Sequence, residues 1–219
     1  MTDATNISVI ADTAHVTAAL CAVSKEETRY YLQGVFFDAR GFIAATNGHI
    51  AFAARCNDAS RLAGITPANV DHATPGVIVP TDALAAALKG KGNIVAISRD
   101  ENGLWWLSCG ALRLHFQPVD GPFPDWTRII PHTPEKETAA HYQPQYIKAL
   151  GDMAKALRDG KRDSANFFHI HQSGEGPALV TFPQADATDG ANRTDCCAVL
   201  MPMRSKNSAS FDTEGFLKA

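Results

Sequence analysis

The chain has 219 residues, of which 45% are hydrophobic and 20% charged, and its formal net charge at neutral pH is −3. This composition is typical of a soluble globular protein of one or two domains, and it provides no overall basic field for nucleic acid. A local stripe of Lys and Arg could still hold DNA, because charges act over a Debye length of about 10 Å.

No apolar run approaches the roughly 20 residues of a membrane helix, and the N-terminus lacks the basic-then-apolar order of a signal peptide. The five cysteines are an odd number without metal-ligand spacing. We therefore expect a cytoplasmic protein with reduced thiols and no membrane association.

The first predicted unit begins with a strand-like run at residues 7–10, followed by a helix that Asp12 or Thr13 caps. In the second unit a strand-like run at 76–80 precedes a helix that Thr81 caps and Gly90 ends. Each helix is followed by three strand-like runs, at 30–37, 42–46 and 50–55 in the first unit and at 94–98, 104–108 and 112–116 in the second.

The third predicted unit covers residues 138–204, with Pro144 in the first turn of its helix and Gly160 as the stop. Its strand-like runs lie at 167–171, 178–182 and 196–203. Three copies of strand, helix and antiparallel meander indicate an α+β fold. The prolines between the second and third units are incompatible with a helix interior and with a central strand, so this segment is predicted to be an extended connector.

No phosphate-binding loop, nucleophile elbow or His-Glu-x-x-His helix occurs in the chain, so we expect neither an enzyme nor a cofactor. His169 and His171 lie on one face of a strand, because side chains alternate along it. They could hold a metal, but the spacing reveals no third ligand. A metal-dependent enzyme at these histidines is an alternative, and it would contain stoichiometric zinc.

Four stretches stand out: Arg-Tyr-Tyr-Leu at 29–32, Ala-Thr-Asn-Gly-His at 45–49, Phe-Pro-Asp-Trp at 123–126 and Val-Leu-Met-Pro-Met-Arg at 199–204. Asn-Gly supplies the positive φ angles of a tight turn, and methionines suit a surface that accepts varied apolar partners. In this order the four stretches resemble the bacterial DNA polymerase III β sliding clamp family, over roughly residues 7–204. The family has Asp at position 47 and Tyr at position 126.

The resemblance implies the DNA-clamp fold, built here from about three strand-helix-meander units. Residues 1–121 would form a complete clamp-like domain and 136–204 a partial one, joined by the Pro-rich connector 122–135. Residues 205–219 would be a mobile tail.

In the family, the turn, the connector and the C-terminal strand form an apolar groove for short linear peptides of polymerases, clamp loaders and repair proteins. Ile50 and Ala51 replace the family's Arg-Leu, which changes the shape of the pocket and removes one charge. The resemblance places the groove wall at Leu32, Thr46, Gly48, His49, Pro124, Arg128, Ile129, Val199, Leu200, Met201, Pro202, Met203 and Arg204.

The family's helices line a central hole, where basic residues face phosphates without reading sequence. The resemblance therefore implies double-stranded DNA, bound without sequence specificity, as a partner. The residues that would face it are Arg29, Tyr30, Tyr31, Lys89, Lys91, Lys148, Lys155 and Arg158.

We thus expect a replication processivity factor that works as a homo-oligomer and tethers polymerase and clamp-loader-type proteins. The alternative is a clamp-like decoy or regulator that binds the same linear motifs without encircling DNA. It would need the groove but no basic helices, and the few cations of the second helix are consistent with it.

Overall fold

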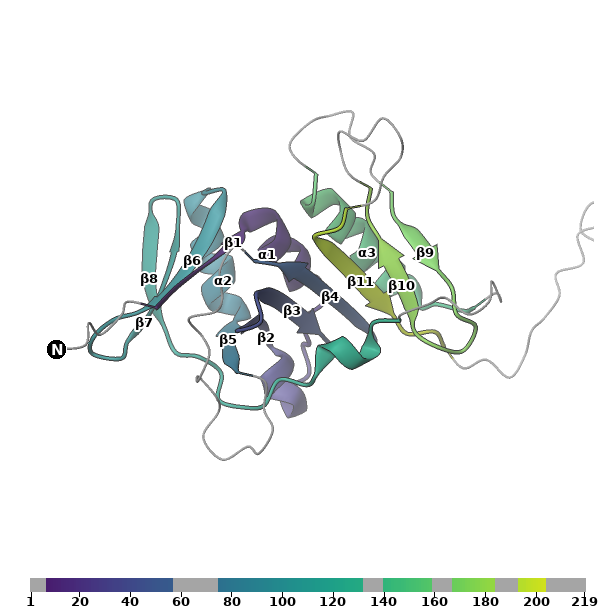
Figure 1. The fold of residues 1–219 in the computed structure, drawn as a ribbon, viewed down its shortest axis with the longest axis horizontal. Coiled ribbons are helices and arrows are strands. Elements are labelled where there is room, and N and C mark those ends of the chain that lie inside the picture. Colours follow the sequence, from purple (N-terminus) through teal and green to yellow (C-terminus); the bar gives the residue numbers. More distant parts are fainter. Residues whose placement is uncertain (1–6, 57–74, 132–139, 159–166, 184–192, 204–219) are drawn as a thin grey trace, which may run out of the picture.

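The computed structural model describes residues 7–56, 75–131, 140–158, 167–183 and 193–203. It confirms an α+β fold in which β-α-β-β-β units recur (Figure 1). The first unit contains β1 (Ile7–Asp12), α1 (Thr13–Leu20), β2 (Gly34–Asp38), β3 (Phe42–Thr46) and β4 (Ile50–Arg55). The second contains β5 (Gly76–Pro80), α2 (Thr81–Ala87), β6 (Ile94–Arg99), β7 (Trp105–Cys109) and β8 (Leu112–Phe116).

The third unit contains α3 (Pro144–Ala156), β9 (His169–His171), β10 (Ala178–Thr181) and β11 (Cys196–Leu200). The strand predicted to precede its helix is not found in the described residues 140–143. There His141 forms only an isolated bridge with Met203. Gly160 and the tail 205–219 lie outside the described residues.

The first two units interlock by exchanging their leading strands. β1 pairs with β6 of the second unit, and β5 pairs with β2 of the first unit, in both cases antiparallel. The result is a four-stranded sheet in the order β1-β6-β7-β8 and a seven-stranded sheet in the order β5-β2-β3-β4-β11-β10-β9. The larger sheet therefore runs without a break from the first unit into the third.

This junction, which we call the β4·β11 seam, joins five residue pairs from Cys196↔Ala54 to Leu200↔Ile50. Behind the seam α1 packs against α3, and Phe52 contacts Phe182 with ring centroids 6.3 Å apart. One main apolar core fills the space between the helices and the sheets. The opposite, outer face of the seven-stranded sheet carries a second, smaller apolar cluster.

The outer cluster holds the connector against the sheet. Phe123 and Trp126 from the connector are buried against Phe36, Ala44 and Ala53 of the strands, and the Phe36 and Phe123 rings stack with centroids 4.8 Å apart. The predicted extended connector contains a short 3₁₀ turn, η4 (Trp126–Ile129), at whose start Asp125 accepts a hydrogen bond from the Thr127 N–H. Figure 1 shows this turn crossing the sheet on the face opposite the helices.

Several local predictions were wrong. Residues 30–32 belong to a 3₁₀ segment, η1 (Glu27–Leu32), rather than to a strand, because burial of Leu32 in the outer cluster overrides the strand propensity of two tyrosines. Asp12 precedes α1 but makes no side-chain cap bond. The Thr81 hydroxyl bonds the Gln33 carbonyl instead of capping α2.

The end of the second helix also differs from its prediction. α2 continues into a 3₁₀ turn, η3 (Leu88–Gly90), and the residue with positive φ is Lys91 rather than Gly90. No helix in the described residues has the length and apolar character needed to cross a lipid bilayer.

Candidate functional site

A cavity of about 300 Å³ opens on the outer face of the seven-stranded sheet, where the β4·β11 seam meets the connector. Its floor is a lateral row of three side chains, because Thr46 pairs with Ala51 and Ala51 pairs with Val199 across β3, β4 and β11. Paired residues on adjacent strands point to the same face. The floor therefore combines residues from the first and third units, and we call this cavity the seam groove.

The β3–β4 turn forms one end of the seam groove, and its own polar atoms hold it in shape. The Thr46 hydroxyl donates to the Ile50 carbonyl and accepts from the Gly48 N–H, while Asn47 Oδ1 accepts from the backbone of His49 and Ile50. Gly48 has φ +88°, a conformation that favours glycine. A Cβ at this position would lie 2.9 Å from an Arg29 guanidinium nitrogen.

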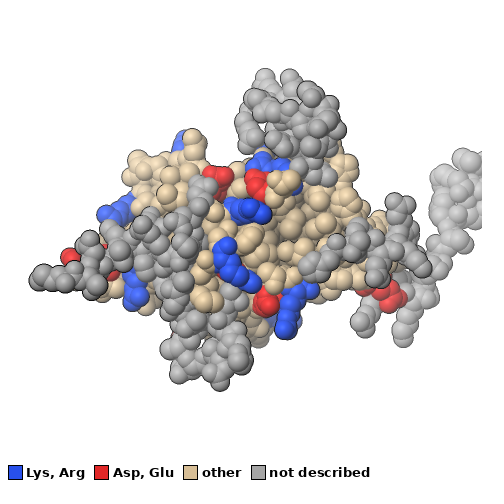
Figure 2. All heavy atoms as spheres, viewed as in Figure 1, with Lys and Arg blue, Asp and Glu red and all other residues tan. Residues whose placement is uncertain are grey.

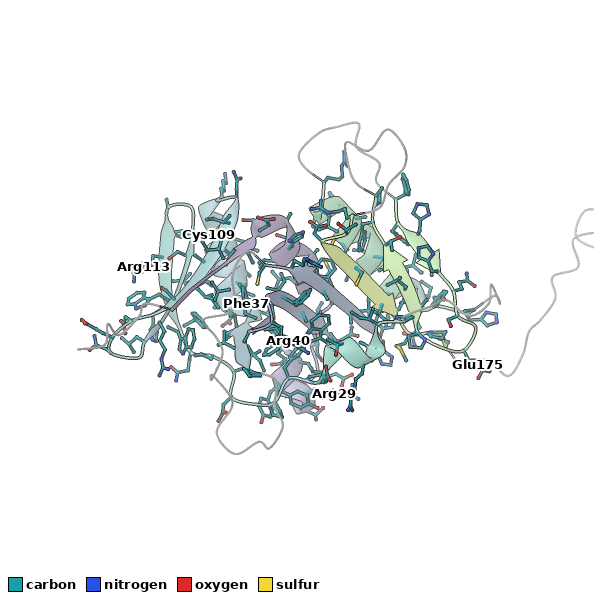
Figure 3. The ribbon with its side chains drawn as sticks, in the orientation of Figure 1. Arg29, Phe37, Arg40, Cys109, Arg113 and Glu175 are labelled. Carbon is teal, nitrogen blue, oxygen red and sulfur yellow. The ribbon has the colours of Figure 1, made fainter. Side chains whose placement is uncertain are left out.

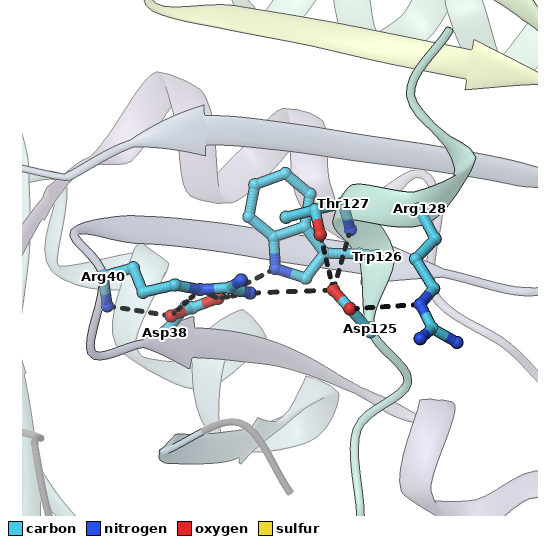
Figure 4. Close-up of polar contacts among 6 residues, drawn as sticks. All are labelled: Asp38, Arg40, Asp125, Trp126, Thr127 and Arg128. Atoms are coloured by element: carbon cyan, nitrogen blue, oxygen red, sulfur yellow. Dashed lines mark hydrogen bonds and ion pairs between the residues drawn. The ribbon is translucent and has the colours of Figure 1, made fainter. Parts of the chain in front are cut away.

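The connector forms the facing wall, and a buried carboxylate holds it in place (Figure 4). Asp38, which is fully buried, accepts bidentate hydrogen bonds from Arg40, Nε to Oδ1 and Nη2 to Oδ2, and a further bond of 2.9 Å from the indole N–H of Trp126. The Arg40 guanidinium also lies over the Trp126 ring, 5.6 Å from its centroid. This cluster positions Pro124 and Ile129 beside the floor.

The surroundings of the groove carry charge of both signs. Arg29 and His49 line it, and the His49 ring stacks on Tyr146 of α3 at 5.4 Å. Asp125 also lines it, and its pKa is lowered, first because it accepts a hydrogen bond from the Thr127 hydroxyl and also because of nearby Arg40 and Arg128. Asp125 is therefore a carboxylate at neutral pH.

The structure brings eight of the predicted groove residues together around this cavity. They are Leu32, Thr46, Gly48, His49, Pro124, Ile129, Val199 and Met201. Their proposed role in peptide binding stays a prediction.

Four other predicted groove residues lie elsewhere. Leu200 cannot line the groove, because alternation along β11 turns it into the main core, where it is fully buried. The Arg128 side chain is 84% exposed and pairs with Asp125 instead. Pro202 and Met203 lie beyond the cavity, where the Met203 N–H bonds the His141 carbonyl. Arg204 lies outside the described residues.

The sequence prediction also omitted groove residues. Arg29 and Tyr31, which the resemblance turns toward DNA, line the seam groove together with Ile50, Ala51 and Trp126. Strand alternation places Ala51 on the outer face, but only the folded register shows that it lies between Thr46 and Val199. Nothing in the sequence shows that Arg29 approaches Gly48.

The helix layer provides few cations. α1 and α2 contain neither Lys nor Arg, and α2 has Asp82 in its first turn. Lys89 and Lys91 are exposed just after α2, and on α3 Lys148 pairs with Asp152 at 2.6 Å while Lys155 is exposed. On the opposite face, Figure 2 shows basic side chains scattered among acidic and neutral ones. The remaining predicted DNA-facing residues are Tyr30, which is 52% exposed in η1, and Arg158 just after α3.

Among the described residues, no third possible metal ligand lies close to the predicted histidine pair. The His169 and His171 rings lie 6.4 Å apart, and His171 hydrogen-bonds the Thr181 hydroxyl. The only described group with metal-ligand geometry is His15, Asp195 and Cys196.

This second group is arranged as an ion-pair cluster. Arg193 donates twice to Asp195 and lies 3.4 Å from His15 Nε2. The Arg193 guanidinium therefore already provides the positive charge that a metal ion would bring to this group. Burial raises the pKa of Cys196 to about 12, which keeps this thiol protonated.

No protein-family model matches the chain. A β sliding clamp of Caulobacter vibrioides is 32% identical over 120 residues, which are 50% of this chain and 30% of that relative. A Borrelia burgdorferi DNA polymerase III subunit β has a TM-score of 0.60 at 10% identity, over 93% of this chain and 66% of that one. A Bartonella birtlesii sliding clamp bound to griselimycin has a TM-score of 0.56 at 20% identity, over 90% and 66% of the two chains.

The solved structures confirm the DNA-clamp fold, and the Caulobacter relative extends the similarity to half of the sequence. The chain therefore has the fold of the β sliding clamps and is similar in sequence to one of them over half of its length. The matched segment spans about a third of the length of that curated relative.

Proposed function

We propose that this protein is a sliding-clamp-like factor of DNA replication that holds partner proteins through linear peptides bound in the seam groove. The observation that carries the proposal is the groove's floor, which is apolar, preformed and shared by two units of a clamp fold. The partners are DNA polymerase and clamp-loader-type proteins, and duplex DNA is contacted without sequence specificity. No catalytic step is part of this role.

The chemistry of the groove suits a short peptide with aliphatic or aromatic anchors. Burying about 200 Å² of a peptide's apolar surface contributes roughly 5 kcal/mol before ordering costs. Arg29 and His49 lie where they could bond a peptide carbonyl or an acidic side chain. A peptide of this kind would bind to a groove that is already formed in the free protein.

The test is calorimetric titration of the whole protein with overlapping peptides that tile a bacterial DNA polymerase III and its clamp-loader subunits. We expect at least one peptide to bind, and Met201→Ala to weaken that binding about 10-fold, because the thioether lines the groove. The matched control is Leu104→Ala, a side chain 45% exposed in the turn just before β7 of the other sheet, which should leave affinity unchanged. Equal losses in both variants, or no binding peptide, would contradict the proposal.

A second candidate, a clamp-like decoy that binds these peptides without encircling DNA, is favoured by the lack of Lys and Arg in α1 and α2. Its test is retention on closed circular duplex DNA compared with the same DNA after linearisation, at a series of salt concentrations. A topologically closed ring stays on the circle and slides off the linear form. A decoy shows no difference between the two and competes with a β clamp for the peptides.

A further inference from the structure

A second cavity lies beside the seam groove on the outer face of the seven-stranded sheet, with a volume of about 480 Å³. Trp126 of the connector lines both cavities, so they adjoin at η4. The floor of the second cavity includes Ala53 and Cys197, which pair across the β4·β11 seam. They lie two positions along the strands from Ala51 and Val199, the corresponding pair in the groove floor. Both cavities therefore follow the same two strands, and we call the second one the arginine pocket.

The arginine pocket has partly exposed apolar walls. Phe42 and Leu179 border it from the sheet, and Ile130 borders it from the connector. Ligand pockets typically have volumes of about 300–1,000 Å³, and this cavity lies within that range. It therefore has room for more than one side chain of a bound segment.

Arginine side chains give the pocket its charge. Arg40, Arg55 and Arg193 line it together with one acidic residue, Asp195. Arg193 already donates two hydrogen bonds to Asp195, so the charges of this pair largely cancel. The buried Asp38 carboxylate stands behind Arg40 and offsets its charge in the same way. Arg55 is therefore the source of the net positive charge.

Two of these guanidinium groups have N–H donors that are open to a ligand. Arg55 is exposed, its guanidinium lies 6.0 Å from the centroid of the Phe42 ring, and it has no carboxylate partner within the described residues. Arg40 bonds Asp38 through Nε and Nη2, and its Nη1 makes no bond to the described part of the chain. A carboxylate in the pocket could therefore accept hydrogen bonds from either arginine without breaking an existing ion pair.

We propose that the arginine pocket binds acidic side chains of a partner protein, in the segment that flanks the peptide held in the seam groove. The inference rests on the proposed function, because the groove anchors the segment whose flank reaches the pocket. Ala51 and Arg55 lie four residues apart on β4, which is about 13 Å at 3.3 Å per residue. An extended peptide therefore needs at least about four residues between its groove anchor and its first acidic side chain.

The route between the two cavities passes over η4, where another cation is exposed. The Arg128 side chain is 84% exposed, and its contact with Asp125 involves only Nε, at 3.5 Å. Crossing the turn also lengthens the path. We therefore expect acidic residues about four to eight positions from the anchor to contact Arg128 or the arginine pocket.

The test compares three forms of the tightest-binding peptide from the polymerase and clamp-loader series, by calorimetry on the full chain. Each form is lengthened by about eight residues at one end or the other. The added segment carries a Glu-Asp pair, a neutral Gln-Asn pair or a Lys-Lys pair. We expect the acidic form to bind about 5-fold more tightly than the neutral form, with the lysine form weakest. The gain should disappear at about 0.5 M salt, because the arginines are exposed to solvent.

Charge reversal locates the effect. Arg55→Glu should make the protein prefer the lysine form over the acidic form, while unchanged binding of the unextended peptide shows that the variant is folded. The matched control is Arg113→Glu, because Arg113 is also an exposed arginine beside an aromatic ring, 4.5 Å from the centroid of Trp106. Figure 3 shows Arg113 on the four-stranded sheet, away from Arg40. This control should keep the preference for the acidic form.

Cys197 provides a readout of occupancy, because it lies in the floor of the arginine pocket. Burial raises the pKa of this thiol to about 11, so a maleimide labels it slowly at neutral pH. The acidic form should slow this labelling more than the unextended peptide does. Cys21, just after α1 on the helix side, is the internal control and should label at an unchanged rate. Peptide mapping distinguishes the two sites, and equal labelling of Cys197 with both peptides would overturn the inference.

The remaining outcomes separate this inference from the proposed function. Equal affinities for the three forms, or an acidic preference that survives Arg55→Glu, would refute the inference and leave the groove its role. If no peptide of the series binds, both proposals fail together. If Arg55→Glu weakened the binding of a short duplex DNA and left the peptide preferences unchanged, the pocket would contact phosphates instead, and the inference would be wrong.

Discussion

At the scale of single residues, the buried carboxylate of Asp38 holds the connector. Asp38→Asn should lower the free energy of unfolding in urea by about 2–3 kcal/mol, because it weakens the bonds with Arg40 and the Trp126 indole in a buried site. Asp125→Asn is the control, since Asp125 is 42% exposed and its pairs should contribute less than about 1 kcal/mol. Equal effects would mean that Asp38 is not the anchor.

A second residue-scale prediction concerns acid stability. Hydrogen bonds from Arg193 lower the pKa of Asp195 to about 2, compared with 3.8 ordinarily. The folded state therefore favours the ionised form, so this stabilisation is complete above about pH 4 and is lost as the pH falls toward about 2. Urea unfolding of Asp195→Asn between pH 2 and 5 should show a shallower dependence on pH than the parent. If the unfolding free energies of the parent and of Asp195→Asn changed equally with pH, Asp195 would not be a source of the acid sensitivity.

At the scale of elements, the β3–β4 turn can be tested with two glycines of similar backbone geometry. Gly48 has φ +88° and Gly41 has φ +91°, but only a Cβ at Gly48 would approach the Arg29 guanidinium, since nothing lies within 4 Å at Gly41. Both alanine variants should lose about 1 kcal/mol of stability from backbone strain. Only Gly48→Ala should also weaken peptide binding in calorimetry, because it displaces Arg29 from the groove.

The elements also show what a sequence can reveal. Strand alternation and turn residues predict β3, β4, β5 and β8 with their observed bounds, because each run is either mainly apolar or, as in β8, alternates apolar and polar residues, and each lies near turn residues such as Gly, Asn or Pro. The 3₁₀ segment around Tyr30 and Tyr31 escapes this reasoning, since tertiary burial of Leu32 decides it. One of the three floor residues, Val199, is equally hidden, because the seam joins residues about 150 positions apart and no local pattern encodes its register.

At the scale of the whole molecule, the connector predicted at residues 122–135 joins segments whose apolar side chains pack together. The main core includes Val16 of α1 and Phe52 of β4 together with Leu150 of α3 and Val180 of β10. Residues on both sides of the connector therefore share one core. We expect a single cooperative thermal transition, with equal calorimetric and van't Hoff enthalpies. Two resolved transitions would show that the third unit folds on its own.

The position of the seam groove also has a mechanical consequence. If a partner is anchored there as proposed, it would pull on the β4·β11 ladder and on the connector at once, because both contribute to the cavity. Within the described residues, the covalent path between the first two units and the third runs through that same connector. Tension from a tethered partner would therefore be divided between the hydrogen bonds of the β4·β11 seam and the connector, which buried Trp126 holds against the sheet. The rupture force of the tether would then measure the strength of the seam.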